Sequence, residues 1–391
     1  IFLYLARILP IVALLPVAVS NFLGLAIFNT QENQHKLKSS TLFAPFICFR
    51  VFVDNDTIFS GQMRSIVEQN IKTCLNVGLR NFIFDVVTER SLGLVPLNYL
   101  RELIVPSKYQ TVLNSQRKSR AWQYCLEEGV NLFSYDDWIV HLNVGTEMSN
   151  NSVISIANFI YDNKFLIGQG QVTCRSTSAN VISVMSDSLR IAMDYGMSRF
   201  GLRCMNMPLF GVKSTFLLCN AGVENSIGFD FGSKPDMTVE NMMVLKAWQQ
   251  GHKVGHIDCE MYEKETNSVF QFVNQRCLFI SEILQTISNT HVFFIYKIGI
   301  FMALAHTMLM HFAISYFVLH FIFPLSGTRP FTLVYGFIFG LIYFMNVFGA
   351  FKTHSFHIRD SIKLLVLTIL MVPFSLLIES SALYQFLFSK Q

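Results

Sequence analysis

The sequence predicts an α/β domain built on a doubly wound parallel sheet and joined to a membrane by about four helices. Two observations support this prediction: apolar strands alternate with helical segments between residues 45 and 160, and four long apolar stretches lie outside that region. Such alternation is typical of a parallel sheet with helices on both faces. The composition agrees, since 52% of the 391 residues are hydrophobic and 14% are charged, which is too apolar for an ordinary soluble protein of this length.

Four apolar stretches are long enough to cross a bilayer, because a hydrocarbon core of about 30 Å needs roughly 20 apolar residues in a helix. They are residues 1–28, 298–323, 331–351 and 364–388. The first is expected to be an anchor rather than a signal peptide, since Pro10 and Pro16 interrupt it and no small-residue cleavage site stands out. The chain begins at Ile1 without a methionine, so further N-terminal residues are expected. The expected domains are a transmembrane helix at 1–28, one large domain at 29–291 and a membrane region of three helices at 292–391.

The basic residues of the short loops predict that the large domain faces the cytosol. One side of the membrane carries Lys36, Lys38, Lys352, Arg359 and Lys363, and the opposite loop carries only Arg329. Short cytosolic loops are richer in lysine and arginine than the loops across the membrane. All eight cysteines lie in the large domain without a CxxC pair, which favours core thiols in a reducing compartment over disulfides or a zinc site. A net charge of +4 is too small to indicate a nucleic-acid partner.

Ionisable side chains occur inside the apolar stretches at His306, His311, His320 and Glu379. Such groups usually face the interior of a helix bundle or a polar cavity. His306 and His311 are five residues apart and do not share a helix face. Hydrogen bonds between helices or snorkelling are therefore expected rather than a metal site or a proton relay.

Strands in the large domain are expected at 45–53, 81–87, 102–105 and 137–142, and helices at 61–77, 117–127 and 150–160. The strand segments are apolar through their middle, and the helical segments place apolar residues at helical spacing. The polar turn Asp54-Asn55-Asp56 follows the first strand. The sequence contains no glycine-rich phosphate loop of the P-loop or GxGxxG type.

The segment Tyr135–Glu147, which reads YDDWIVHLNVGTE, carries the most specific information about a site. Its strand is expected to end at the carboxyl edge of the sheet, where open α/β sheets hold ligands. Asp136 and Asp137 come before the apolar run, and Asn143, Val144 and Gly145 follow it. A hard divalent cation prefers carboxylate oxygens, so the carboxylate pair that a metal site would need at this edge is missing.

Several long strings of the sequence carry a resemblance to a known family. They are APFICFRV, KSRAWQYCLE, DWIVHL, NFIYDNKFLIGQGQVT and EMYEK. With the first and last apolar stretches, they make the chain similar to the Egghead-type β-1,4-mannosyltransferases of invertebrates, members of glycosyltransferase family 2. The resemblance implies a GT-A domain facing the cytosol of the endoplasmic reticulum or Golgi, GDP-mannose as donor and Mn²⁺ or Mg²⁺ as cofactor. It also implies transfer with inversion to the membrane lipid glucosylceramide, in glycosphingolipid biosynthesis.

The resemblance also implies which residues contact the donor. Arg50, Asp56, Thr88 and Glu89 match positions at the ends of the first two strands, and Lys118 and Arg120 match the family's KSRA motif. Cations at these positions would face the diphosphate as charge-assisted donors. The alternative for Lys118 and Arg120 is a solvated helix face. The family's TRG turn before Asp56 is replaced by Val53-Asp54-Asn55, which puts an acid beside the expected phosphates.

Three catalytic motifs of the family are altered in this sequence. The metal motif DEET is replaced by Asn143-Val144-Gly145-Thr146, and Glu147 is expected to be a surface or helix-capping acid. The base motif Ala-Glu-Asp becomes Val239-Glu240-Asn241, where Glu240 points about 100° away from the base position on a helix. The motif QRKRW becomes Gln275-Arg276-Cys277-Leu278-Phe279.

Two functions follow from these substitutions. The first is a membrane-bound mannosyltransferase homologue with impaired catalysis, since an inverting transfer needs both a cation for the leaving diphosphate and a base for the acceptor hydroxyl. The second is a catalytically dead pseudoenzyme that regulates or scaffolds an active homologue. A processive polysaccharide synthase is disfavoured, because Leu278 and Phe279 interrupt the QxxRW motif that such enzymes use.

Overall fold

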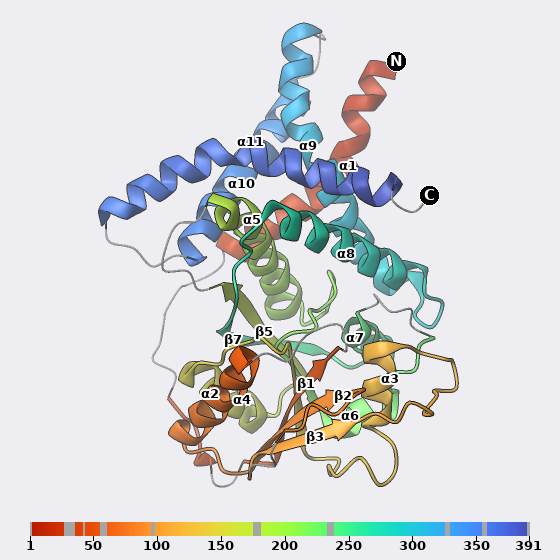
Figure 1. Cartoon of the computed structure of the whole chain (residues 1–391). Helices are drawn as coiled ribbons and strands as arrows, with labels where there is room; N and C mark the ends of the chain where they lie inside the picture. Colours follow the sequence, from red (N-terminus) through yellow and green to blue (C-terminus); the bar gives the residue numbers. More distant parts are fainter. Residues whose placement is uncertain are drawn as a thin grey trace.

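A computed structural model describes residues 2–26, 36–41, 44–54, 61–94, 98–174, 181–232, 238–324, 329–353 and 358–388. Asn55 and Asp56, in the expected polar turn, lie outside these residues. In Figure 1 the sheet and its covering helices form one half of the molecule, and the helices from the two ends of the chain form the other half.

The strands are β1 (Ile47–Val53), β2 (Phe82–Thr88), β3 (Leu100–Ile104), β4 (Trp138–Leu142), β5 (Ile167–Cys174), β6 (Leu217–Asn220) and β7 (Val254–Glu263). The helices are α1 (Phe2–Ala26), α2 (Gly61–Val77), α3 (Arg117–Tyr124), α4 (Asn150–Asp162), α5 (Val181–Ser198), α6 (Ala221–Ile227), α7 (Val239–Gln249), α8 (Val269–Ser288), α9 (Ile298–Ile322), α10 (Arg329–Thr353) and α11 (Ile358–Phe388). A π-helix (Arg199–Cys204) follows α5, and a 3₁₀ turn (Phe294–Lys297) precedes α9.

The sheet has seven strands in the order β3-β2-β1-β4-β6-β5-β7. The strands β1, β2, β3 and β4 pair in parallel, as do β5 and β7, whereas β6 is antiparallel to both of its neighbours. The sheet is therefore mixed, and the expectation of a wholly parallel sheet is wrong. The physical reason is that the short β6 enters between β4 and β5 from the opposite edge, and its other end leads directly into α6.

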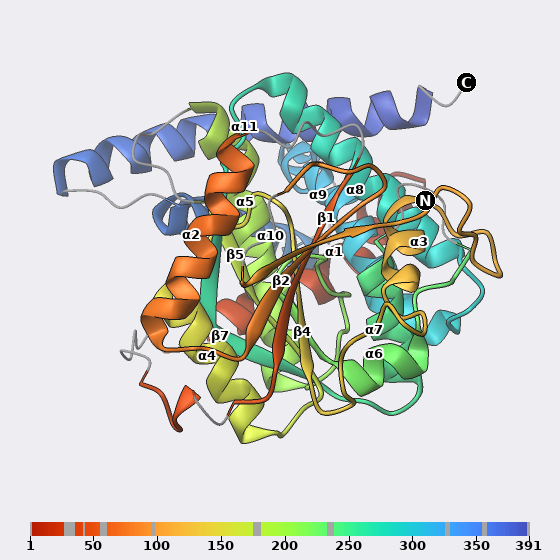
Figure 2. The ribbon, with the colours of Figure 1, turned by 60° about the horizontal axis from the view of Figure 1, so that its bottom comes forward.

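Helices cover both faces of the sheet and define two cores. On one face, α2 and α4 supply Val67 and Ile156 to a core that contains Phe49 and Val140 of the sheet. On the other face, α3 and α7 supply Trp122 and other side chains that pack with sheet residues such as Leu217. Figure 2 shows α2 and α4 on one side of the strands and α3, α6 and α7 on the other. This layering is the one that strand–helix alternation predicts.

The start of α4 is fixed by a capping box. Ser149 accepts a hydrogen bond from the Ser152 backbone, and the Ser152 side chain accepts one from the Ser149 backbone. Such reciprocal bonds satisfy the amide groups that a helix start leaves unpaired. The cap is thus Ser149, and Glu147 lies before the helix, where its backbone pairs with Tyr262 of β7.

A third core joins the two ends of the chain to α5. It includes Leu14 of α1, Leu189 of α5, Tyr335 of α10 and Leu376 of α11. The close approach of α10 to α5 depends on glycine, because a Cβ added at Gly349 of α10 would lie 1.8 Å from the Ser188 carbonyl oxygen of α5. Small residues allow helix backbones to pack closely in this way.

Two helices are apolar and long enough to cross a membrane by length and composition, at residues 329–353 and 361–386. Shorter apolar helical stretches lie at residues 10–26 and 294–310 in the described part of the chain. Four transmembrane helices, as expected from the sequence, are therefore not confirmed. In Figure 1, α11 lies across the upright helices α1 and α9.

His306 forms the expected kind of hydrogen bond between helices. The side chain is buried in α9, and its Nδ1 lies 3.2 Å from the Leu14 carbonyl oxygen of α1. The cysteines carry no disulfide and six of the eight are buried. The prediction of a helix-to-helix contact at His306 is thus confirmed, and that of core thiols is confirmed for six cysteines but not for the exposed Cys204 or the partly buried Cys277.

Candidate functional site at the carboxyl edge of the sheet

The parallel strands end at one edge of the sheet, where residues 54, 89 and 143 follow β1, β2 and β4. The strands β5 and β7 end at the same edge, because β6 is antiparallel to both β4 and β5. Ligands of open α/β sheets bind at this edge. A hollow of about 690 Å³ lies elsewhere, near the start of β4, and is lined by Tyr135, Trp138, Tyr161 and His252, among others. None of the described residues that the sequence predicts to bind the donor or a metal, or to act in catalysis, is part of its lining. We therefore place the candidate site at the carboxyl edge.

Asn143 opens a tight turn at the end of β4. The Thr146 amide donates a hydrogen bond of 3.1 Å to the Asn143 carbonyl oxygen, and a buried Asn70 of α2 holds the turn through Thr146 O and Met148 N, at 2.8 Å each. Asparagine is favoured at the first position of such turns. The degenerate metal motif is therefore a fixed backbone turn, with the exposed Asn143 side chain directed to the end of β7.

Glu263, the last residue of β7, is the carboxylate nearest to the degenerate metal position. Asn143 Nδ2 donates a hydrogen bond of 2.9 Å to Glu263 Oε1, and the hydroxyls of Thr146 and Thr215 lie 3.4 and 3.3 Å from the same oxygen. The backbone explains this convergence. Antiparallel pairing of β4 with β6 brings Thr215 opposite Asn143, and the pairing of Glu147 with Tyr262 brings the turn beside Glu263.

The sequence alone does not predict the role of Glu263, which lies in the string EMYEK that carries the family resemblance. The available signal was an acid at the end of an apolar, strand-like segment. Its partners lie about 50 and 120 positions away, so the sequence alone does not show what it contacts.

The residues at this edge do not form a complete set of ligands for a divalent cation. Hard cations such as Mn²⁺ or Mg²⁺ prefer several carboxylate oxygens. Asn143 donates an N–H to Glu263, whereas a metal ligand must present an oxygen lone pair to the cation. Among the described residues, no group of three or more histidine, cysteine, aspartate and glutamate side chains is placed to hold a metal ion. The residues present therefore do not fit the cation that the resemblance implied.

Arg50 lies in the middle of β1 with a fully buried side chain, not at the strand end. Its Nη1 lies 2.5 Å from Glu224 Oε1, and His141 Nε2 lies 2.8 Å from Glu224 Oε2. Burial favours the neutral acid, yet Arg50 and then His141 outweigh it and hold the pKa of Glu224 below its ordinary value. A contact between Arg50 and a donor would require this buried pair to open.

Thr88 and Glu89 follow β2 at the carboxyl edge. The Thr88 hydroxyl is buried and bonds the Arg90 carbonyl oxygen at 2.8 Å, which closes a local turn. Glu89 lies at the edge and accepts a hydrogen bond of 2.5 Å from Arg120 of α3. Asp54, the acid that replaces the family's turn residue, is paired with Arg117 at 3.2 Å.

Lys118 of α3 is paired with Glu240 of α7. The ammonium lies 2.6 Å from Glu240 Oε1, and Trp122 Nε1 donates a hydrogen bond of 2.9 Å to the same oxygen. Burial would raise the pKa of Glu240, but the Lys118 charge and then His141 overcome burial and lower that pKa. Two of the expected site residues are thus partners of one another, and Glu240 faces α3.

Asn241 lies beside Glu240 and points in another direction, as neighbouring positions on a helix do. Its Oδ1 accepts a hydrogen bond of 3.0 Å from the Val212 amide. A Cβ added at the preceding Gly211, which has φ +79°, would lie 2.8 Å from this oxygen. The residue at the base position therefore holds the 211–216 segment, which also carries Thr215.

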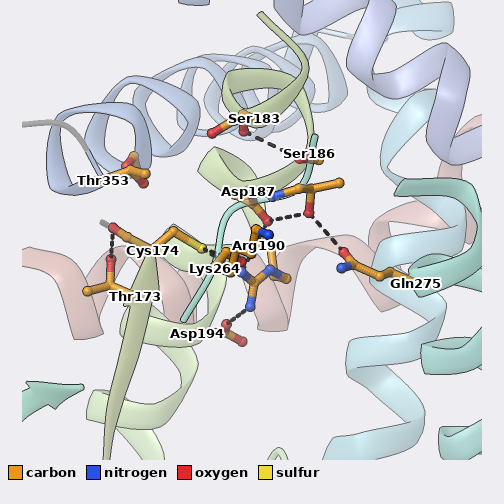
Figure 3. A network of polar contacts seen from close by, with 12 residues as sticks. Thr173, Cys174, Ser183, Ser186, Asp187, Arg190, Asp194, Lys264, Gln275 and Thr353 are labelled. Atoms are coloured by element: carbon orange, nitrogen blue, oxygen red, sulfur yellow. Dashed lines mark hydrogen bonds and ion pairs between the residues drawn. The ribbon is translucent and has the colours of Figure 1, made fainter. Parts of the chain in front are cut away.

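Gln275 and Arg276 lie on α8, at the junction with the helices from the chain ends. Gln275 Oε1 accepts a hydrogen bond of 3.2 Å from the Thr266 hydroxyl, and the Thr266 amide bonds Asp187 of α5 at 3.1 Å. Figure 3 shows Asp187, Arg190 and Asp194 along α5 near Gln275 and Lys264. Arg276 lies 2.5 Å from Glu379 of α11. Leu278 and Phe279 are exposed on the same helix.

The three altered motifs are connected through two short segments. Residues 212–215 link Asn241 to Glu263, since Val212 bonds Asn241 and Thr215 contacts Glu263. Residues 263–266 link Glu263 to Gln275 through Thr266. Lys213 adds an ion pair with Asp194 of α5. The sequence-predicted positions Asn143, Asn241 and Gln275 are thus linked by these hydrogen bonds together with the chain segments 212–215 and 263–266.

Comparison with known proteins decides the family. A family profile described as "Glycosyl transferase family group 2" matches residues 138–352. The chain belongs to this family. Its segment 138–352 begins with β4 and contains the Asn143 turn, Glu263 and α8, so the matched region includes the network described above.

Curated relatives of this family 2 chain are named mannosyltransferases. Beta-1,4-mannosyltransferase bre-3 of Caenorhabditis elegans is 32% identical over 394 aligned residues, covering 100% of this chain and 86% of the relative. Beta-1,4-mannosyltransferase egh of Drosophila melanogaster is 33% identical over 358 residues, covering 91% of this chain and 78% of the relative. The resemblance inferred from the sequence strings is thereby confirmed.

Among solved structures, the chain is similar to a mannosyltransferase of Pyrobaculum calidifontis in complex with GDP-Man and Mn²⁺. The identity is 10%, the TM-score is 0.47, and the match covers 98% of this chain and 100% of that chain.

Proposed function

We propose that this family 2 chain is a membrane-attached homologue of the β-1,4-mannosyltransferases, with impaired transfer of mannose from GDP-mannose to glucosylceramide. The observation that carries the proposal is the Asn143–Glu263 contact of 2.9 Å at the carboxyl edge of the sheet. An amide N–H directed at the remaining carboxylate replaces the ligand pair that a cation would need. The names of the relatives, β-1,4-mannosyltransferases, support mannose as the transferred sugar, and the sequence resemblance implies the donor and the acceptor.

The position of the base supports the same conclusion. Asn241 cannot accept the proton of an acceptor hydroxyl, and its Oδ1 is already bonded to the Val212 amide. Glu240, the adjacent acid, is fully buried and paired with Lys118 and Trp122. General base catalysis is worth roughly two to four orders of magnitude in rate, so a large loss of transfer is expected.

A direct assay tests the proposal. The full chain, purified in detergent or reconstituted in lipid, is incubated with GDP-mannose and glucosylceramide beside one of the named relatives as the active control. We expect turnover at least a hundredfold below that of the relative, in line with loss of one such catalytic group. Equal turnover would contradict the proposal and make Glu263 and Glu240 the first residues to replace.

A second candidate is a pseudoenzyme that regulates or scaffolds an active homologue. This candidate is favoured because the basic side chains expected to bind the donor are already paired with acids of the chain. Lys118 is paired with Glu240, and Arg120 with Glu89. A chain that binds neither GDP nor GDP-mannose, but co-purifies with a homologous transferase from its own cells, would support this candidate. Binding of the donor without such a partner would support the first.

Membrane attachment is part of the proposal. The exposed side of α11 is apolar, with Ile362, Val366, Leu370, Phe374 and Leu377 all accessible, and monomeric soluble proteins rarely expose continuous patches of this kind. We place the sheet domain on the cytosolic side of the endoplasmic reticulum or Golgi membrane. The basic loop residues support that side.

A further inference from the structure

We propose that Glu263 is the acidic half of the divalent-cation position at this edge, and that Asn143 closes that position by donating its amide N–H where a cation would lie. The inference rests on the proposed function for the kind of ligand expected at the edge. Beyond that function, the ligand is a residue of β7, and one atom of the residue that follows β4 decides whether the site is open.

The first support is geometric. Glu263 Oε1 lies 2.9 Å from Asn143 Nδ2 and 3.3 to 3.4 Å from the Thr215 and Thr146 hydroxyls. All three neighbours of this oxygen are neutral. Arg190 of α5, which interacts electrostatically with Glu263, is itself paired with Asp187 and Asp194. A negatively charged oxygen at the ligand edge is the kind of group that hard cations bind.

The second support is the rigidity of the surroundings. The turn 143–146 is clamped by the buried Asn70, and its far end pairs with β7 through Glu147 and Tyr262 at 2.8 and 3.0 Å. A side chain replaced at residue 143 will therefore keep its position relative to Glu263. Ligands held by a fixed backbone lose little conformational freedom when a metal binds.

Replacing Asn143 with aspartate exchanges the N–H donor for a carboxylate oxygen of almost the same shape. Two carboxylates about 3 Å apart repel one another, and a divalent cation bound between them removes that repulsion. The variant is therefore expected to recruit Mn²⁺ or Mg²⁺ through Asp at 143 and Glu263 together. In the parent chain the amide supplies a hydrogen bond instead, and no cation is recruited.

The experiment measures Mn²⁺ binding to the purified full chain by electron paramagnetic resonance of free Mn²⁺, with no donor, acceptor or GDP present. Four proteins are compared: the parent, Asn143→Asp, Glu263→Gln and the double variant Asn143→Asp with Glu263→Gln. We expect Asn143→Asp to bind Mn²⁺ at least tenfold more tightly than the other three. Thermal unfolding of each protein establishes that it is folded, and only folded variants are compared.

Two results would overturn the inference. If the folded Asn143→Asp variant shows no gain, or if the double variant binds as tightly as the single one, Glu263 is not the partner ligand. If the parent already binds Mn²⁺ tightly and Glu263→Gln abolishes that binding, Asn143 does not close the position. Because the assay contains no sugar substrate, a failed transfer reaction and a failed cation site are distinguished.

Discussion

The carboxylate of Glu240 and the ammonium of Lys118 lie 2.6 Å apart, with Glu240 fully buried and Lys118 partly exposed. By sequence, these two residues are expected to act separately, Lys118 on the donor diphosphate and Glu240 near the acceptor. The structure makes them one ion pair between α3 and α7, so donor binding by Lys118 competes with a stabilising contact of the fold.

Lys118→Met is expected to destabilise the fold, because it leaves the buried Glu240 carboxylate without its cation. Removing one partner of a buried ion pair typically costs about 3–5 kcal/mol, and the partial exposure of Lys118 places this pair toward the lower end of that range. Denaturant unfolding of the detergent-solubilised chain measures the loss. The matched control is Lys118→Met combined with Glu240→Gln, which should recover part of the stability because an amide still accepts the Trp122 hydrogen bond.

The same pair predicts a pH dependence of stability. The folded-state pKa of Glu240 is lowered, because the Lys118 charge outweighs the effect of burial. A lowered carboxyl pKa contributes stability that is present above the unfolded value of about 4.3 and is lost as the pH falls through the lower folded value. In Lys118→Met, burial without the Lys118 charge raises the folded-state pKa of Glu240. The stability difference between parent and variant should therefore be largest at neutral pH and begin to shrink above the unfolded pKa of about 4.3 as the pH falls. A difference that stays constant from pH 7 to pH 3 would contradict the pairing.

GDP binding should be weak and almost independent of Mn²⁺. Cations at the edge, such as Arg120 beside Glu89, can contact a diphosphate directly, whereas Asn143 offers no carboxylate for a metal bridge. Calorimetric titration of GDP with and without Mn²⁺ measures the effect. Tightening by tenfold or more, about 1.4 kcal/mol, would show that another metal ligand set operates in the parent chain.

Much of the sheet could be predicted from the sequence. The strands that could not be predicted were obscured for physical reasons. The strands β1, β2 and β4 are mostly apolar, each with one arginine, aspartate or histidine, and the sequence predicts their ends to within two residues. In β5, the glycines 168 and 170 lower the strand signal, but a Cβ there would lie 2.5 Å from Phe159 and 2.0 Å from Phe216. The strand β6 has only four residues, too few for an alternation pattern to be recognised.

The sequence alone identifies the altered motifs of the site, but it does not predict which side chains contact one another. The altered motifs identify Asn143, Asn241 and Gln275, and each of these side chains is hydrogen-bonded to Glu263 or to a residue of the segments 212–215 and 263–266. The pairs Lys118–Glu240 and Asn143–Glu263 depend on how α3, α7, β4 and β7 pack, and their members are about 120 positions apart. Linear spacing carries no information about such pairs.

The orientation of the sheet domain can be tested on residues that the structure shows to be accessible. Asn150 begins α4, is exposed and starts the sequon Asn150-Asn151-Ser152, so it would carry a glycan in the lumen but not in the cytosol. We expect no glycan at Asn150.

We also expect the exposed Cys204 to react with a membrane-impermeant maleimide in sealed microsomes, and Cys204→Ser to lose most of that labelling. Glycan on Asn150, or labelling of Cys204 only after permeabilisation, would place the domain in the lumen. A second sequon begins at Asn55, outside the described residues.

Transfer activity should return only when several positions are repaired together, because groups acting on one transition state are not additive. The combined variant is Asn143→Asp, Gly145→Glu, Asn241→Asp, Leu278→Arg and Phe279→Trp. The structure accommodates these changes: a Cβ at Gly145 meets no atom within 4 Å, aspartate at 241 keeps an oxygen for the Val212 amide, and residues 278 and 279 are exposed.

With GDP-mannose, glucosylceramide and Mn²⁺, this variant is expected to exceed the parent by at least a hundredfold, the effect of restoring one general base. Asn241→Asp alone should stay within about tenfold of the parent, since the cation and the QxxRW positions remain altered. The matched control is the combined variant with Glu263→Gln added, which should lose the gain if Glu263 completes the cation position. A single Asn241→Asp substitution that restored full turnover would show that the base alone limits this chain, and that the Asn143 turn is compatible with catalysis.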